Sequence, residues 1–320
     1  MSTPVVAVTD TVFPDLEPAK EALAAAGAEL RLASGSSPEE ILEVAADADG
    51  LLVTYAKITP EVIAGLTQCK VIGRFGIGVD NIDLPAAREA GIIVTYAPVY
   101  CLDEVSDHAM ALLLSLVRKI PYANRLVRAG RWAMPAVVPI ARLRGRTLGL
   151  VGLGNIPQRL APKAQAFGLE VISSDPFAPD DVFERLGVER VEFDELLARS
   201  DYISIHAPLT PQTANMFGAE AFAKMKPDAL LINTARGPLV DVEALADALE
   251  AGEVGGAGLD VLPTEPPDAS LRLLGRDDVI LTPHTGFYSE DALLDLQRTV
   301  ATDVATVLVG GTPRFPVAPR

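Results

Sequence analysis

The sequence predicts an α/β protein built from two parallel-sheet domains. Short apolar runs rich in Val, Ile and Leu alternate along the chain with longer segments rich in Ala, Leu, Glu and Arg. This alternation is typical of parallel strands that crossover helices bury on both faces. The chain has 320 residues and is 49% hydrophobic. Because single cores seldom grow beyond about 250–300 residues, we expect two domains.

The predicted strands fall into two sets. The first set comprises residues 5–8, 30–32, 51–54, 71–74 and 92–95. The second set comprises residues 147–152, 169–173, 202–206, 230–233, 256–260 and 279–281, and each run ends where polar, Gly or Pro residues begin. Each set is large enough for a sheet of its own.

Two long helices are predicted between and after these sets. The segment 103–117 has apolar residues at helical spacing, and we expect Asp103 to cap its N-terminus. The segment 289–309 has similar spacing and follows the last strand of the second set, so it can return to the first domain. The expected domains are residues 1–100 with 290–320, and residues 101–289.

The composition argues against several classes of protein. The formal net charge of −16 makes contact with phosphate backbones unfavourable, and we see no basic patch that would override this field. Cys69 and Cys101 lack CxxC spacing, so neither a disulfide framework nor a metal site is expected. The N-terminus lacks a signal-peptide pattern, and no apolar run is long enough to span a membrane. We therefore expect a soluble cytoplasmic protein that binds neither nucleic acid nor membranes.

A glycine-rich turn follows the first strand of the second set. The strand continues into Gly152-Leu-Gly-Asn-Ile-Pro157, where the glycines allow a tight turn and close approach of a pyrophosphate to a helix N-terminus. Pro157 replaces the third glycine of this dinucleotide fingerprint. Pro162 follows a turn later, so we expect a kink or a displaced start of the helix. The amides of Asn155 and Ile156 are expected to contact the phosphates.

An aspartate lies just after the next predicted strand, 21 residues beyond Gly154. The carboxylate of Asp175 would accept hydrogen bonds from ribose hydroxyls and repel a 2′-phosphate. No arginine immediately follows it. A GxG pair alone also fits an ordinary strand-to-helix turn, but the strand, the helix and Asp175 together favour a site for NAD rather than NADP.

Three chemically active residues, Arg236, Glu265 and His284, each lie shortly after a predicted strand. In a parallel sheet the carboxyl ends of the strands share one edge, where ligands bind. Reduction of a 2-oxo acid needs a cation for the carboxylate, an acid for the developing alkoxide and a partner that positions this acid. A carboxylate beside an imidazole stabilises the imidazolium, so His284 could carry a proton at neutral pH. Alternatively, Arg236 could pair with Asp241 or Glu243, and Glu265 alone would be an ordinary loop carboxylate.

Six segments together resemble the D-isomer-specific 2-hydroxyacid dehydrogenases. They are the glycine turn, FGIGVDNID at 75–83, HAPLT at 206–210, NTARG at 233–237, GLDVLPTEPP at 258–267 and TPH at 282–284. They occur in the family's order and cover nearly the whole chain. The resemblance implies an α/β fold of two doubly wound parallel-sheet domains, a Rossmann NAD-binding domain inserted in a flavodoxin-like substrate domain. It also implies hydride transfer between NAD and a small 2-hydroxy or 2-oxo acid.

The resemblance further implies roles for individual residues. Arg236 would bind the substrate carboxylate and carbonyl, and His284 would be the acid and base, paired with Glu265. The amides of Gly76 and Ile77 would hold the substrate carboxylate, and Phe287 would line the substrate pocket. The expected cofactor-binding residues are Gly152, Gly154, Asn155, Ile156, Asp175, His206, Pro208, Thr213, Thr234, Ala235, Asp260, His284 and Gly286.

Within the family, the segments 100–108 and 284–290 look most like the branch named for the C-terminal binding proteins, which includes transcriptional corepressors. An alternative function is therefore a scaffold whose NAD occupancy controls assembly with a protein partner. The complete set of Arg236, Glu265 and His284 favours chemistry. Because no Lys or Arg cluster marks the first domain, unphosphorylated acids such as glyoxylate or hydroxypyruvate are favoured as substrates.

The two other histidines and the 103–117 helix have less specific interpretations. We expect His108 to be a packed, hydrogen-bonded residue and His206 to have a structural or cofactor-lining role. The wide apolar face of the helix fits either an intrachain core or dimerisation, and the resemblance favours a homodimer through the cofactor domain.

Overall fold

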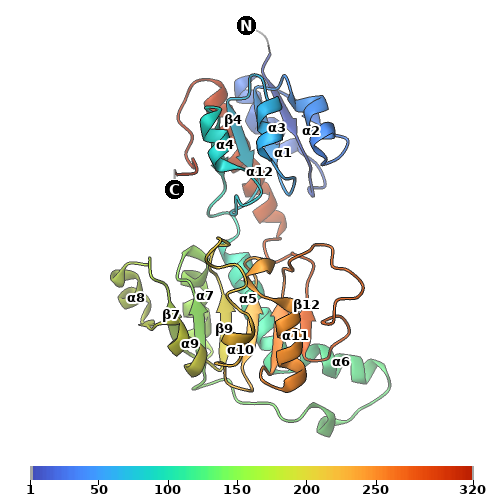
Figure 1. The fold of residues 1–320 in the computed structure, drawn as a ribbon, viewed down its shortest axis with the longest axis vertical. Helices are drawn as coiled ribbons and strands as arrows, with labels where there is room; N and C mark the ends of the chain where they lie inside the picture. The colour runs from blue at the N-terminus through green and yellow to red at the C-terminus, as the bar shows by residue number, and fades with distance from the viewer. Residues whose placement is uncertain (1–2, 319–320) are drawn as a thin grey trace. The chain divides into compact units, whose positions relative to one another are not determined.

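The computed structural model describes residues 3–318, which form two compact units (Figure 1). Unit 1 consists of the segments up to Tyr100 and from Ser289, and unit 2 is Cys101–Tyr288. Unit 2 is therefore inserted in the sequence of unit 1, and the division lies within one residue of the expected boundaries. The substrate and cofactor roles of the units stay predictions.

Unit 1 contains a five-stranded parallel sheet in the order β2-β1-β3-β4-β5. The strands are β1 Val5–Val8, β2 Glu29–Leu32, β3 Gly50–Val53, β4 Val71–Arg74 and β5 Ile93–Tyr96. This 2-1-3-4-5 order is that of flavodoxin-like doubly wound sheets. Strands β1, β3 and β4 consist almost wholly of buried residues, as expected for a sheet covered on both faces.

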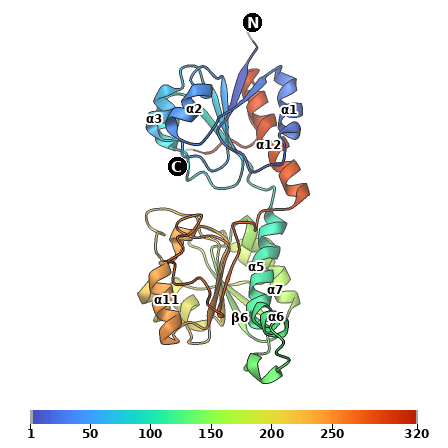
Figure 2. The ribbon, with the colours of Figure 1, turned by 90° about the vertical axis from the view of Figure 1, so that its right-hand side faces the viewer.

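Helices cover both faces of the unit 1 sheet (Figure 2). They are α1 Glu17–Leu23 with η1 Ala24–Ala26, α2 Pro38–Ala45, α3 Pro60–Gly65, α4 Leu84–Glu89 and α12 Glu290–Leu308. Helix α12 packs on α1 and on strands β3, β4 and β5. The Ser289 hydroxyl caps it by accepting from the Ala292 amide at 2.9 Å. The predicted return of the C-terminal helix to the first domain is therefore confirmed.

Unit 2 contains a seven-stranded parallel sheet in the order β12-β11-β10-β9-β6-β7-β8. The strands are β6 Thr147–Val151, β7 Glu170–Ser174, β8 Glu189–Arg190, β9 Tyr202–Ile205, β10 Leu230–Asn233, β11 Gly256–Leu259 and β12 Val279–Leu281. The order is that of a Rossmann sheet. Strands β7 and β8 are added on one side of β6 and strands β9 to β12 on the other, so the strand order reverses between β6 and β9. The sequence patterns missed β8 because its two residues are both polar and exposed.

The helices of unit 2 lie on both faces of its sheet, with α5 and α7 on one side and α11 on the other (Figure 2). They are α5 Leu102–Val117, α6 Ile120–Arg128, η2 Met134–Val137, α7 Asn155–Ala166, α8 Asp180–Leu186, α9 Phe193–Arg199, α10 Ala219–Phe222, η3 Gly237–Leu239 and α11 Val242–Ala251. The predicted cap at Asp103 is wrong: α5 begins at Leu102 after Cys101, and Asp103 lies in its first turn. A carboxylate there favours the helix through its dipole instead.

The apolar face of α5 is used within unit 2. Val105, Ala109, Leu112, Leu113 and Leu116 are all buried, and the helix packs on α7, β10, β11 and β12. The two doubly wound parallel sheets confirm the predicted fold class. Among the described residues, we find no helix that combines the length and apolar character required to cross a membrane.

Candidate active site

Three loops at one edge of the unit 2 sheet carry Arg236, Glu265 and His284. Each loop follows one of the neighbouring parallel strands β10, β11 and β12. The carboxyl ends of these strands therefore share one edge, as the sequence predicted. The side chains of Glu265 and His284 are in direct contact, and Arg236 lies in the adjacent loop.

The His284–Glu265 pair is the closest contact between two predicted catalytic residues. His284 Nδ1 lies 2.7 Å from Glu265 Oε2, and the other oxygen, Oε1, accepts from the Leu262 amide at 2.9 Å. Burial favours the neutral acid, but the hydrogen bonds from His284 and Leu262 outweigh it and lower the pKa of Glu265. Glu265 is therefore a carboxylate at neutral pH, and it orients the imidazole through Nδ1.

The Arg236 loop is held by its own backbone and by the next loop. The Asn233 side chain accepts from the Ala235 amide at 3.0 Å and donates to the Arg236 carbonyl at 2.9 Å. A Cβ at Gly237 would lie only 1.9 Å from the Leu262 carbonyl carbon. Glycine thus allows this loop to pack directly against the loop that leads to Glu265. The Arg236 guanidinium donates to the Ala235 carbonyl at 2.8 Å.

The backbone of His284 is fixed by the loop around it. Its φ of 53° lies in the left-handed region, which non-glycine residues seldom adopt. The His284 amide donates to the Asp260 carbonyl at 2.8 Å, and the Asp260 carboxylate accepts from the amides of Thr285 and Gly286. Phe287 meets the His284 ring edge to face, with centroids 6.0 Å apart. The expected substrate-lining aromatic therefore lies beside the imidazole.

The glycine turn has the geometry expected of a dinucleotide site. Gly152 has a φ of +96°, and a Cβ there would lie 3.1 Å from the His206 carbonyl carbon. Helix α7 begins at Asn155 directly after Gly154 and continues through Pro162. The expected displacement of the helix start is therefore wrong: Pro157 lies in the first turn, where amides lack intrahelical partners anyway, and Pro162 lies inside the helix. The alternative expectation, a kink at Pro162, stays a prediction.

Asp175 closes the turn at the end of β7. Its Oδ2 accepts from the Leu153 amide at 2.7 Å, and its Oδ1 accepts from the amides of Phe177 and Ala178. Arg190 of β8 donates to the Asp175 carbonyl oxygen at 2.7 Å. This cation lies 15 residues beyond Asp175 in the chain, so the residues directly after Asp175 do not reveal it. The Asp175 carboxylate still supplies the acceptor oxygens and the negative charge on which that argument depends.

Two observations fit a dinucleotide at this edge. Apart from the two neighbouring residues of the chain, no described residue has an atom within 4 Å of a Cβ built on Gly154, so the turn is open where a pyrophosphate would approach. In the loop after β10, the Thr234 hydroxyl is buried and has no hydrogen-bond partner among the described residues. A buried polar atom of this kind normally has a partner. Both positions are predicted cofactor-binding residues.

The loop after β9 holds further predicted cofactor residues. Desolvation lowers the pKa of His206 to about 3, so its ring is neutral, and it lies 2.8 Å from the Ser204 hydroxyl. The Thr213 hydroxyl donates to the Pro208 carbonyl at 2.7 Å. These contacts give His206 a structural environment and no acid–base partner among the described residues.

The predicted carboxylate-binding amides of Gly76 and Ile77 belong to unit 1. Gly76 follows β4 with a φ of +148°, and its amide donates to the Arg74 carbonyl at 2.9 Å. The Gly76 amide therefore already has a partner in this conformation. The roles of Gly76 and Ile77 stay predictions.

Comparison with known proteins identifies the family. Residues 110–286 match the model of the D-isomer specific 2-hydroxyacid dehydrogenase, NAD binding domain. The chain belongs to this dehydrogenase family. Unit 2 contains the family's NAD binding domain, as the glycine turn predicted. The assignment to the branch of the C-terminal binding proteins stays a prediction.

Several members of the dehydrogenase family are similar over much of this chain. A D-3-phosphoglycerate dehydrogenase of Methanocaldococcus jannaschii is 43% identical over 284 residues, which are 88% of this chain and 54% of the relative. The chain spans about half the length of the curated relatives it matches. The TT0316 protein of Thermus thermophilus has a TM-score of 0.89 and 35% identity, covering 98% of this chain and all of that one. A D-lactate dehydrogenase of Aquifex aeolicus, complexed with NAD and lactic acid, has a TM-score of 0.90 and 29% identity, covering 99% of this chain and 100% of that one.

Alanine at two glycines should separate cofactor binding from loop packing. Gly154 has an ordinary φ of −70° and open space around it, so Gly154→Ala should leave the melting temperature unchanged. The added methyl group should weaken NADH binding at least about tenfold, or about 1.4 kcal/mol. Gly237→Ala should instead lower stability by about 2–3 kcal/mol, because its Cβ overlaps the Leu262 backbone. Thermal melts and NADH fluorescence titrations measure both, and equal effects of the two variants would contradict this assignment.

Proposed function

We propose that this chain is an NAD-dependent D-2-hydroxyacid dehydrogenase that interconverts small 2-hydroxy and 2-oxo acids. The observation that carries the proposal is the 2.7 Å contact between His284 and Glu265, next to the Arg236 loop and on the sheet that carries the open glycine turn. Membership of the dehydrogenase family supports the same conclusion. A protein that only bound NAD would have no need of this acid–base pair.

The proposed mechanism assigns one task to each side chain. When bound, NADH supplies the hydride. Arg236 binds the substrate carboxylate and polarises the carbonyl, so that negative charge developing on oxygen is stabilised. Because Nδ1 of His284 is directed to Glu265, Nε2 is the ring nitrogen that delivers a proton to this oxygen. In the oxidative direction, Nε2 removes the hydroxyl proton.

The remaining groups hold the reactants. Glu265 stabilises the imidazolium form of His284 and fixes the ring. The Phe287 ring lies beside the imidazole, and we assign it to the substrate pocket. Asp175 binds the ribose, and the first amides of α7, those of Asn155 and Ile156, bind the phosphates. We assign Ile77 and Gly76 to the substrate carboxylate, and binding there requires the Gly76 amide to exchange its partner.

The substrate class is the finer part of the proposal. We favour unphosphorylated acids such as glyoxylate or hydroxypyruvate, because no cluster of cations marks unit 1 in the sequence. The relatives named D-3-phosphoglycerate dehydrogenase favour a phosphorylated acid as the second candidate. The two candidates differ in one phosphate group, so paired substrates distinguish them.

A panel of 2-oxo acids with NADH tests the proposed function. The decrease in absorbance of reduced nicotinamide should be fast with at least one acid, and hydroxypyruvate should exceed 3-phosphohydroxypyruvate. His284→Ala and Arg236→Ala should each lower turnover at least about 100-fold while NADH still binds. Measurable NADH binding without turnover of any acid would instead support the NAD-sensing scaffold.

Replacing the carboxylate of Glu265 should change the pH dependence of reduction. The lowered pKa of Glu265 keeps it charged at neutral pH, and this carboxylate lies 2.7 Å from Nδ1 of the His284 imidazole. Glu265→Gln is neutral, so the alkaline decline in the reduction rate should move toward acid by about one pH unit, equivalent to about 1.4 kcal/mol. The pH profile of kcat/KM measures the shift. A profile identical to that of the unmodified protein would argue against the pairing.

We also propose that the chain forms a homodimer through residues 118–146, here called the arm. The arm links α5 to β6 and contains α6 and η2. Large apolar side chains are exposed along it: Ile120, Val127, Trp132, Met134 and Val138. Such a concentration marks an interaction surface. The face of α5 that the sequence suggested for dimerisation is buried inside unit 2 instead.

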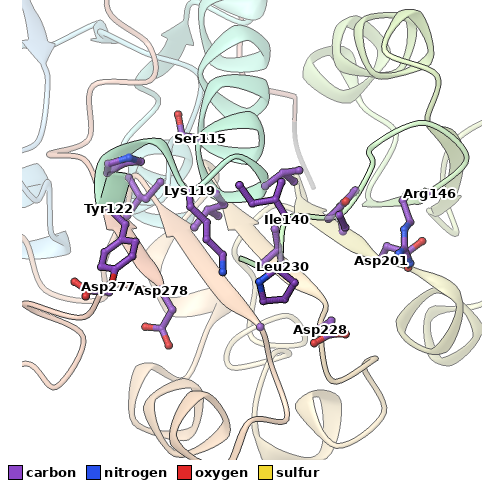
Figure 3. Close-up of a pocket in the computed structure, with 18 of the residues that line it drawn as sticks. Ser115, Lys119, Tyr122, Ile140, Arg146, Asp201, Asp228, Leu230, Asp277 and Asp278 are labelled. Carbon is purple, nitrogen blue, oxygen red and sulfur yellow. The ribbon is translucent and has the colours of Figure 1, made fainter. Parts of the chain in front are cut away.

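The charge of the arm supports a second copy of the chain as its partner. The arm contains eight Lys and Arg residues and no Asp or Glu, whereas the whole chain has a net charge of −16. The expectation that the chain has no basic patch is therefore wrong for this segment. A cavity of about 670 Å³ beside the arm is lined by Asp201, Asp228, Asp277 and Asp278 (Figure 3), of which Asp201 and Asp277 pair with Arg146 and Arg125 of the same arm. It lies where strands β9, β10 and β12 begin, opposite the edge of the three catalytic loops.

A charge introduced at the exposed tryptophan of the arm should prevent association. Trp132 is 89% exposed, and Trp132→Glu should convert a dimer into a monomer of 33.8 kDa at micromolar concentration. Phe177, which is 92% exposed outside the arm, provides the matched control Phe177→Glu. Light scattering after size exclusion measures both masses. A protein that is monomeric without substitution, or a dimer that Trp132→Glu leaves intact, would refute the arm interface.

A further inference from the structure

His108 of α5 contacts the loop that carries the predicted acid–base residue. Its side chain is 22% exposed. The ring atom Nε2 lies 2.9 Å from the Thr282 hydroxyl and 3.3 Å from Asp260 Oδ1. A Cβ built on Gly286 would lie 3.4 Å from the His108 ring, so the ring also packs against the far side of the loop. His108 thus contacts residues on both sides of His284.

The hydrogen bonds of Thr282 fix the proton on His108. The Thr282 hydroxyl lies 2.6 Å from Asp260 Oδ1, and a carboxylate oxygen can only accept. The hydroxyl proton therefore points to Asp260, and the hydroxyl oxygen must accept from His108. Nε2 of His108 consequently carries a hydrogen in both the neutral and the charged ring. The result is a series of two hydrogen bonds with one direction, from His108 to Thr282 and from Thr282 to Asp260.

Asp260 is the final acceptor of these hydrogen bonds. It is 3% exposed, and besides Thr282 its carboxylate accepts from the amides of Thr285 at 2.9 Å and Gly286 at 2.8 Å. Burial alone would raise its pKa, but the hydrogen bonds from His108, Thr282 and the two amides lower it. A buried carboxylate is stable only when donors compensate its charge. Of these four donors, His108 is the one with a titratable side chain.

Other charged groups near His108 belong to different contacts. On α5 and α7, Lys163 pairs with Asp107 at 2.6 Å. At the sheet edge, Glu265 pairs with His284. Neither pair bonds to the His108 ring among the described contacts. The ring is therefore directed to Thr282 and Asp260.

We propose that His108 is a positioning residue for the dehydrogenase reaction. It holds Thr282 and Asp260, and through them the loop in which His284 adopts its left-handed backbone conformation. His108 does not exchange a proton with substrate. This inference rests on the proposed function, because it concerns the geometry of the same acid–base residue and of the loop predicted to face the nicotinamide amide.

A double-mutant cycle tests this role. His108→Leu removes the donor, and Thr282→Val removes the next link. Each should lower kcat at least about tenfold, and the double variant should be no slower than the slower single variant, because both break one chain. His108→Gln, whose amide nitrogen can replace Nε2, should recover kcat to within about threefold of the unmodified protein. Asp107→Asn, the neighbouring residue on α5, is the control and should leave kcat unchanged.

A readout that needs no turnover separates this proposal from the proposed function. The chain has only three histidines, so NMR of ¹⁵N-labelled imidazoles can follow His284 individually. The His284 signals should move or broaden in His108→Leu and Thr282→Val, and should be retained in His108→Gln and Asp107→Asn. If no acid is turned over, the same cycle is measured on NADH dissociation constants. Multiplicative losses in the double variant, or unchanged His284 signals in folded His108→Leu, would overturn the positioning role.

Discussion

The candidate site depends on the close packing of three loops at one edge of a parallel sheet. Strands β10, β11 and β12 fix where these loops begin, but loops have little regular backbone bonding of their own. Direct contacts supply the missing order. The Asn233 side chain ties the first loop to itself, and Gly237 lets that loop touch the Leu262 backbone. The Leu262 amide in turn donates to Glu265. The packing of the two loop backbones therefore fixes the position of this carboxylate.

A second set of polar contacts performs the same task for the loop of His284. The carboxylate of Asp260 is buried, which is unfavourable for a charge, yet it binds two amides and a hydroxyl from the following loop. These bonds offset the cost of burial and hold a backbone conformation that His284 would rarely adopt alone. The loop of His284 is thus ordered because the buried Asp260 carboxylate requires hydrogen-bond donors. A fully apolar edge could not direct a polar loop in this way.

Much of this arrangement could be predicted from sequence because it follows from periodicity and from residue chemistry. Apolar runs indicated both sheets, and the order of motifs indicated the family and the residues Arg236, Glu265 and His284. The two-residue strand β8 could not be found, because polar exposed residues leave no apolar pattern. Arg190 beside Asp175, and His108 beside Asp260, join positions far apart in the chain. Contacts of this kind depend on strand order and helix placement, which local patterns do not contain.

Helix α5 connects the two edges of the unit 2 sheet, because His108 contacts the carboxyl edge and Ser115, Leu116 and Val117 line the cavity at the amino edge. Ser115 lies seven positions after His108, which is about 10 Å along a helix. The buried side chains of α5 pack on α7, β10 and β11 along this length. Close-packed helices resist small displacements. We therefore expect that association through the arm does not shift α5 and does not displace His284. The two edges are therefore expected to act independently, with α5 as a rigid support for both.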